Sequence, residues 1–324
     1  MDLFSTQQMT GSNEHAMLRK NLAALAEKNP KAAAMIEQAV VPVGLSFVDT
    51  DDGVPGAELN GVALASKRRP MKDAERLAEQ FDPTKSACAA VVGFGLGYHC
   101  GTMLQRLGNC GVVLCFEPDL GLLRGVLERI DYSSMFATNR FFLLTDSDDS
   151  VALTQMFKGI EAVVGLGVEI VNHPPSSGRI GKAADQFGRV LGEGVSSTRT
   201  HVVTALANSQ ISFRNSLMNL DYYTSCAGVE SLKDSCKGKP AVVVAAGPSL
   251  ERNLEQLGEP GVRDSVVIIA VQTVLKTMLA RGIKPHFVAA LDYHELSKRF
   301  YEGLTASDVE GVRLVVEPQA NPAI

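Results

Sequence analysis

The chain has 324 residues, of which 45% are hydrophobic and 21% charged, and its formal net charge is −5 at pH 7. This composition excludes intrinsic disorder, collagen-like repeats and coiled coils, and the negative charge argues against a general nucleic-acid binder. The length is sufficient for about two domains, each with its own core.

The N-terminal segment and the cysteines indicate the compartment. The first residues, MDLFSTQQMTGSNEHAMLRK, contain no apolar signal-peptide core. No apolar run reaches the roughly 18 residues of a membrane span. The six cysteines include no C-x-x-C pair, so buried thiols are expected rather than disulfides or a zinc site. We therefore expect a cytoplasmic protein with no membrane span.

Residues 1–85 are predicted to form a mixed α/β prelude. Asn13 is expected to cap a helix that runs to about Lys28, and the Asn29-Pro30 pair is expected to start a second helix. Two short strands and a helix should follow, at Val41–Val48, Val62–Ala65 and Pro70–Phe81.

Residues 86–178 are predicted to form a Rossmann-like domain. Continuous apolar strands that alternate with helices are typical of a parallel sheet covered on both faces. The loop His173–Gly178 is expected to end the domain. The expected elements are strands at Ala87–Val92, Val112–Phe116, Phe141–Leu144 and within Val163–Val171, with helices at Tyr98–Leu107 and Leu120–Ile130.

A helical connector is predicted over residues 179–238, followed by a second Rossmann-like domain over 239–324. Four apolar residues of the connector share a helical face, which favours packing between domains: Leu206, Phe213, Leu217 and Leu220. The fold class is therefore α/β, with two parallel-sheet domains. The expected strands are Ala241–Ala246, Val266–Val271, Phe287–Leu291 and Val312–Val316, with helices at Pro248–Leu257, Val274–Arg281 and Glu295–Leu304.

A first candidate ligand site is the cluster Gly93, Gly95 and Gly97 between a strand and a helix. Such glycines let a ligand approach a helix N-terminus, and Glu117, which ends the next strand, is placed to bind ribose hydroxyls. Alternatively, the glycines only permit tight packing and Glu117 only precedes a helix. The pattern leaves both interpretations open.

A second candidate is the sequence Gly247-Pro248-Ser249 after a buried strand. Gly247 suits an N-cap and Pro248 the first helical position, which places Ser249 in the first turn of the helix. A helix N-terminus at the carboxyl end of a strand favours a phosphate, although the lysine of a P-loop is missing. The alternative is a capped helix start with no ligand.

A third candidate is Asp292, which ends a strand at the same predicted sheet edge. It could hold a metal ion that bridges phosphates, or act as a base. It could instead be the N-cap of a capping box with Glu295. Gln272 and Thr273 end the intervening strand and are expected at the same edge.

Several of these motifs together resemble a known family. The segments VVVAAGPSLERNLEQL and IIAVQTVLKTMLARGIKPHFVAALD resemble the MptE-like family. This family includes archaeal 6-hydroxymethylpterin diphosphokinases and the central domain of bacterial motility accessory factors (Maf). FRNSLMNL and the earlier VVGFGLGYH…FEPD unit are similar to the Maf branch.

The resemblance implies a nucleotide-using transferase. The Maf branch implies transfer of a nonulosonic acid from a CMP-activated donor to Ser or Thr of flagellin or another protein. The archaeal branch implies transfer of diphosphate from ATP to a hydroxymethyl pterin, with Mg²⁺ held at Asp292. A third interpretation is an accessory protein that binds a nucleotide or partner without turnover. By motif position, Gly247, Pro248, Ser249, Gln272 and Thr273 would bind the donor and Asp292 would be catalytic.

Two departures and the C-terminus bear on the resemblance. His286 stands where the family usually has Asp, and Gln272 where a small or acidic residue is common. The last predicted strand is followed by only eight residues, EPQANPAI. Since an uncovered apolar edge strand favours aggregation, we expect the second domain to be truncated here.

Overall fold

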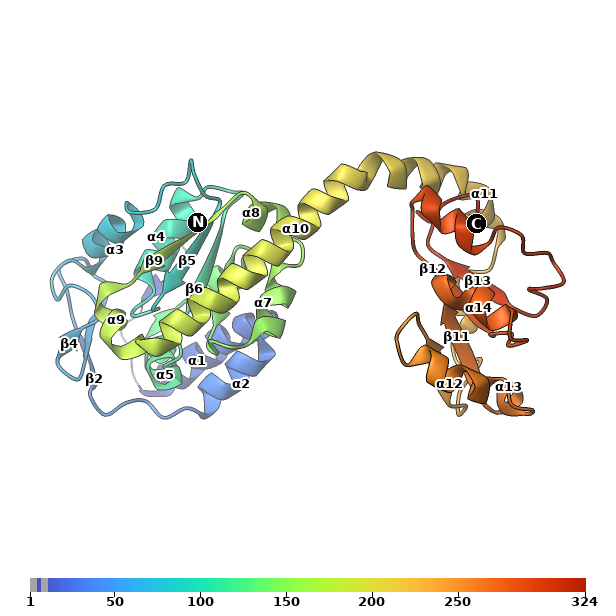
Figure 1. The fold of residues 1–324 in the computed structure, drawn as a ribbon. Coiled ribbons are helices and arrows are strands. Elements are labelled where there is room, and N and C mark those ends of the chain that lie inside the picture. The colour runs from blue at the N-terminus through green and yellow to red at the C-terminus, as the bar shows by residue number, and fades with distance from the viewer. Residues whose placement is uncertain (1–4, 7–10) are drawn as a thin grey trace. The chain divides into compact units, whose positions relative to one another are not determined.

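The computed structural model describes residues 5–6 and 11–324 (Figure 1). The chain divides into two compact units, unit 1 (Met1–Val203) and unit 2 (Thr204–Ile324). Within the described residues, no helix combines the length and apolar character needed to cross a membrane.

Unit 1 is built on a four-stranded parallel sheet, as predicted. Its strand order is β8-β6-β5-β9. The four strands are β5 (Cys88–Val92), β6 (Val112–Phe116), β8 (Phe141–Leu144) and β9 (Val168–Asn172).

Helices cover both faces of this sheet. Every residue of β5 and β6 is buried, and alternate residues of these strands belong to two separate apolar clusters. Ala89 and Val91 face one cluster, whereas Cys88 and Ala90 face the other. The first cluster is formed with α1 (Gly11–Ala26), α2 (Pro30–Gln38), α3 (Pro70–Ala78), α4 (Tyr98–Arg106), α5 (Leu120–Arg129) and α6 (Ser133–Ala137).

The prelude has more strands than the sequence predicted. An antiparallel sheet joins β2 (Leu45–Val48), β3 (Gly56–Leu59) and β4 (Val62–Ala63), and β3 was not expected. The side chain of Asn29 accepts from Ala32 N, so this cap is confirmed. The first helix begins at Gly11, two residues before the predicted cap. A further antiparallel pair joins β1 (Ser5–Thr6) to β7 (Ile130–Asp131).

The segment after β9 differs from the prediction of a loop. Most of this segment is a helix, α9 (Pro174–Ile180), and His173 occupies its N-cap position. The two prolines do not prevent the helix, since proline is tolerated in a first turn. A 37-residue helix follows, α10 (Lys182–Met218), and runs across the sheet of unit 1 (Figure 1). Phe187 and Leu191 on α10 are buried in the second cluster. Residues of α7 (Ser150–Phe157) also belong to this cluster. Along the chain, α7 is followed by α8 (Glu161–Gly165) and then by β9. The two units meet inside α10, between Val203 and Thr204.

Unit 2 has a second parallel sheet, with strand order β10-β11-β12-β13. One face packs against helices, with Val244, Ile268 and Val288 in the core. On the other face Val243 of β10 is 70% exposed, whereas Val267 of β11 is buried. The strands are β10 (Ala241–Val244), β11 (Val267–Val271), β12 (Phe287–Ala290) and β13 (Arg313–Val316). The helices are α11 (Leu220–Ser225), η1 (Val229–Leu232), α12 (Leu250–Leu257), α13 (Val262–Ser265), η2 (Gln272–Val274), α14 (Leu275–Leu279) and η3 (Glu295–Phe300).

The cysteines are free thiols, but only three of them are buried. Cys88, Cys100 and Cys115 lie in the core of unit 1. The expectation of buried thiols is wrong for Cys110, which lies in the turn before β6, and for Cys226, which follows α11.

Candidate functional site

The carboxyl ends of three neighbouring strands in unit 2 carry the residues that the sequence predicted. Since β10, β11 and β12 are parallel and adjacent, the segments that follow them emerge at one edge of the sheet. These segments contain Gly247-Pro248-Ser249 after β10, Gln272-Thr273 after β11 and Asp292 after β12. The fold therefore brings the predicted groups to a common edge.

Gln272 connects two of the three strand ends through its side chain. It is only 4% exposed, and a buried amide must find hydrogen-bond partners inside the protein. Its Nε2 donates to the Asp292 carboxylate, and its Oε1 accepts from Tyr301 Oη at 3.3 Å. Burial, aided by the charge of Asp292, raises the pKa of Tyr301 to about 12, so this phenol keeps its proton. The result is a fixed chain of polar groups that ends at the Asp292 carboxylate.

Asp292 does not act as a helix cap. The N-cap position of η3 is His294, and no side chain caps this helix. The capping box with Glu295 is therefore not formed, and the exposed carboxylate has Gln272 as its hydrogen-bond donor. The backbone carbonyl of Asp292 accepts a hydrogen bond from Asn321 N at 3.0 Å. Of the two roles that the sequence allowed for Asp292, helix cap or site residue, the structure does not support the cap.

The Gly247–Ser249 segment is an exposed turn before α12. The helix starts at Leu250, two residues later than predicted, and Ser249 occupies the N-cap position with no side-chain cap bond. Leu250 N bonds to Gly247 O at 3.0 Å, which closes the turn. The Ser249 hydroxyl is thus not engaged in capping. Thr273 is exposed at the same edge.

Two asparagines that sequence reasoning missed hold this edge in place. Asn215 is 5% exposed, and its Nδ2 donates to the carbonyls of Tyr293 and Gln319 at 3.0 Å each. Asn219, one turn later, donates to the carbonyls of Pro318 and Ala320. Both lie in the sequence FRNSLMNL, whose two asparagines at i and i+4 share a helix face. That spacing was the available signal.

Asp292 is the one carboxylate that the sequence pointed to as a magnesium ligand. Among the described residues, no group of three or more His, Cys, Asp or Glu side chains is arranged to hold a metal ion. Mg²⁺ is commonly bound through one or two carboxylates together with substrate phosphates. Asp292 fits such a role only where a nucleotide supplies the other oxygen ligands.

The glycine cluster of unit 1 is covered by other parts of the chain. Gly93, Gly95 and Gly97 have positive φ angles of 102°, 49° and 79°, which favour glycine. A Cβ on Gly95 would lie 2.4 Å from His173 Cε1, and one on Gly93 would lie 2.4 Å from Ser176 Cβ. The start of α9 thus packs directly onto the glycines, where the predicted ligand would have been.

Glu117 has protein partners in place of a ribose. It is completely buried, and Arg179 donates to both carboxylate oxygens at 2.7 Å. The backbone N–H groups of Phe94 and Asp119 also donate to it. These four bonds occupy the carboxylate, so Glu117 ties the glycine loop to α9.

Comparisons with known proteins bear on unit 2. Residues 214–324 match the family model described as 6-hydroxymethylpterin diphosphokinase MptE-like. The chain is also similar to the solved structure of a Maf glycosyltransferase from Magnetospirillum magneticum AMB-1, with 15% identity and a TM-score of 0.47. That similarity covers 95% of this chain and 54% of the other, so this chain spans about half the length of that protein. None of the curated proteins matches. The family model confirms the resemblance seen in the sequence over residues 214–324.

Proposed function

We propose that the carboxyl edge of the unit 2 sheet is the donor site of a nucleotide-dependent transferase. The observation that carries this proposal is the Gln272–Asp292 hydrogen bond, which fixes an exposed carboxylate at the sheet edge where the exposed turn at Ser249 also lies. The MptE-like family match over residues 214–324 supports a transferase of this class.

The leading candidate reaction transfers a nonulosonic acid-like sugar from a CMP-activated donor to a Ser or Thr hydroxyl of flagellin or another protein. The Maf-like segments of the sequence favour it. Ser249 and the backbone of its turn would contact the donor phosphate, with Gln272 and Thr273 beside it. Asp292 would accept a hydrogen bond from the attacking hydroxyl. Positioning and electrostatic stabilisation of the leaving nucleotide would supply most of the rate. The cytoplasmic location of this reaction stays a prediction from the sequence.

The second candidate is a diphosphokinase that uses Mg·ATP and a pterin-like acceptor. The description of the matching family favours it. Here Asp292 would bind Mg²⁺ together with the phosphates of ATP, and the ion would neutralise charge on the transferred group.

Calorimetric titration of the full chain with CMP and with Mg·ATP separates the two candidates. Saturable binding of CMP alone favours the glycosyltransferase, and binding of ATP only with Mg²⁺ favours the diphosphokinase. Ser249→Ala should weaken the preferred ligand at least about tenfold, because a hydrogen bond involving a charged group is worth about 1.5–3 kcal/mol. Asp292→Asn should weaken Mg·ATP by a similar factor and leave CMP unchanged, because Asp292 contacts the donor only in the diphosphokinase.

Asp264→Asn is the matched control, because Asp264 is an exposed carboxylate in α13, which precedes β11 at the opposite edge of the sheet. It should bind as the wild type does. Unchanged affinity in both edge variants would refute the donor site. Absence of nucleotide binding by the folded chain would favour an accessory protein instead.

A further inference from the structure

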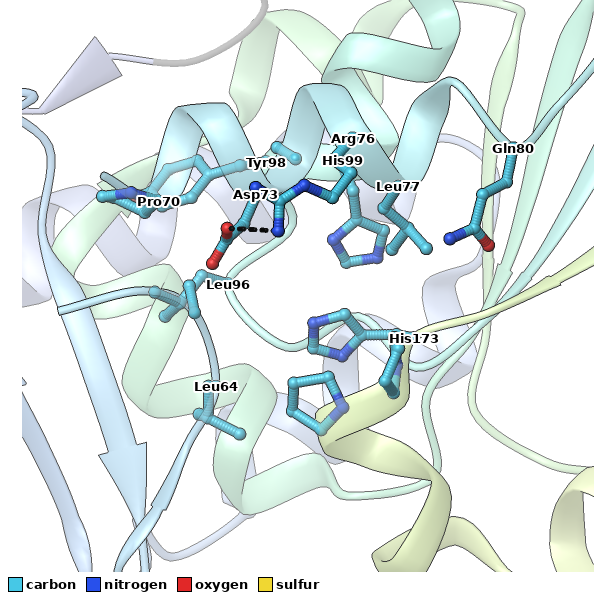
Figure 2. A pocket seen from close by; sticks show the side chains of 14 residues that line it. Leu64, Pro70, Asp73, Arg76, Leu77, Gln80, Leu96, Tyr98, His99 and His173 are labelled. Carbon is cyan, nitrogen blue, oxygen red and sulfur yellow. Dashed lines mark ion pairs between the residues drawn. The ribbon is translucent and has the colours of Figure 1, made fainter. Parts of the chain in front are cut away.

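Unit 1 contains a pocket of about 240 Å³ that the proposed function does not use (Figure 2). Four separate segments form its walls: α3, the residues after β4, the start of α4 and the start of α9. All of its lining residues lie between Leu64 and Pro175, outside the MptE-like domain. It therefore requires an explanation of its own.

The pocket lies where parallel α/β sheets usually bind ligands. In the order β8-β6-β5-β9, the chain passes from β5 to β6 on one side and later crosses back to place β9 on the other side of β5. Ligands of such sheets bind outside the carboxyl ends of the strands at the point where the order reverses. Leu96 follows β5 and His173 follows β9, and both line the pocket. The pocket therefore lies at the point of the sheet where the strand order reverses.

The cover over the glycines directs the ligand to this neighbouring space. Since His173 and Ser176 fill the space above Gly93 and Gly95, a nucleotide cannot approach those glycines closely. The pocket opens beside the same loop, between Leu96 and α3. The binding position in unit 1 is therefore displaced from the glycines toward α3.

One wall of the pocket is a rigid pair of imidazole rings. His99 and His173 are stacked, with ring centroids 4.5 Å apart and planes inclined by 6°. His99 Nε2 donates to Gly93 O at 3.0 Å, and His173 Nδ1 lies 2.8 Å from Ser176 Oγ. Burial, followed by the charge of His99, lowers the pKa of His173 to about 2, so this ring stays neutral. Leu64 and Leu96, together with Leu77 of α3, add apolar side chains to the pocket lining.

Helix α3 supplies a positively charged group to the pocket. Arg76 extends from α3 toward the pocket beside Asp73, as Figure 2 shows. Their closest N–O distance is 4.0 Å and the Arg76 side chain is 71% exposed, so the ion pair is weak and leaves guanidinium donors for a ligand. Residues 67–80 contain five basic and three acidic side chains, so the segment carries a positive charge. This charge favours an anion at the mouth of the pocket.

We propose that this pocket binds a small organic anion, a carboxylate or a phosphate monoester with a flat apolar body. The anionic group pairs with Arg76, and the body packs against His99, His173 and the leucines. Ligand pockets commonly measure about 300–1,000 Å³. The smaller volume here suits a ligand below the size of a dinucleotide.

Ligand-detected NMR titration of the full chain tests this proposal with three probes of similar shape: benzoate, phenyl phosphate and neutral benzamide. Either anion should bind saturably and at least about tenfold more tightly than benzamide, in line with a charge-assisted hydrogen bond. The tighter anion identifies the head group as carboxylate or phosphate. Arg76→Gln should remove the preference for the anion, since the exposed side chain can be replaced without disturbing the core.

Arg106→Gln is the matched control, because Arg106 is an exposed arginine in α4 that does not line the pocket. It should leave the preference intact. No saturable binding of either anion, or equal losses in the two arginine variants, would overturn the proposal. CMP and Mg·ATP binding in unit 2 should be unchanged by Arg76→Gln, which keeps this test separate from that of the proposed function.

Discussion

At the scale of single residues, His173 prevents a ligand from reaching the glycine loop of unit 1. The sequence shows a glycine cluster between a strand and a helix, which is a common nucleotide-binding pattern. It cannot show that a histidine far along the chain occupies the space above Gly95. Nor can it show that Arg179 pairs with Glu117. Both contacts depend on the tertiary position of α9, for which local spacing carries no signal.

The neutral state of His173 makes the stability of unit 1 depend on pH. Its pKa is about 2 in the fold, lowered by burial and by the charges of His99 and Arg179, whereas an unfolded histidine titrates near pH 6.5. Between these values the unfolded chain binds a proton that the folded chain does not. The free energy of unfolding should therefore fall as the pH drops below about 6.5, by up to about 1.4 kcal/mol per pH unit.

Urea denaturation between about pH 7 and pH 5 measures this slope. His173→Gln should flatten it, even where the substitution lowers the stability at neutral pH. His15→Gln removes an exposed histidine of α1 and should keep the wild-type slope. The same slope in wild type and His173→Gln would show that another group titrates.

At the scale of secondary-structure elements, the strands were predictable and the anchors of their ends were not. Continuous apolar runs marked β5, β6 and β11 in the sequence, as expected for strands whose two faces are covered. The common position of Gln272 and Asp292 was predictable, because the carboxyl ends of parallel strands lie at one edge of a sheet. The bond between their side chains, and the bonds from Asn215 to the carbonyls of Tyr293 and Gln319, depend on packing that the sequence pattern does not specify.

Asn215 should control the order of the loops that carry the candidate site. Its amide satisfies the backbone carbonyls of Tyr293 and Gln319, so Asn215→Ala leaves two acceptors without this donor. At about 1 kcal/mol per bond, unit 2 should lose about 2 kcal/mol of stability. Hydrogen exchange should accelerate at the Asn321 amide, which bonds to Asp292 O. Asn208→Ala is the control, because Asn208 is half-buried on the same helix and its side chain bonds within that helix, to Thr204 O. Equal exchange rates at Asn321 in both variants would contradict this role.

At the scale of the whole molecule, periodicity predicted which residues share a face but not what covers them. Leu206, Phe213 and Leu217 lie on one face of α10, as expected from their spacing. They are 68%, 67% and 56% exposed, so unit 2 does not itself cover this face of the helix. The same helix buries Phe187 and Leu191 in unit 1, where a sheet is available to receive them. Both halves of α10 thus carry the same helical spacing of apolar residues. Only the tertiary structure around each half determines whether those residues are buried.

The two units should unfold as separate cooperative elements, because each has its own apolar core. Leu123 in α5 and Ile268 in β11 are both fully buried, one in each unit. Truncation of either to alanine should cost about 2–5 kcal/mol through lost burial and a cavity. Hydrogen exchange can report β5 and β11 amides separately. Leu123→Ala should accelerate exchange in β5 and spare β11, and Ile268→Ala should do the reverse. If either substitution accelerated both strands equally, α10 would have to transmit stability between the units, and the chain would unfold as one cooperative body.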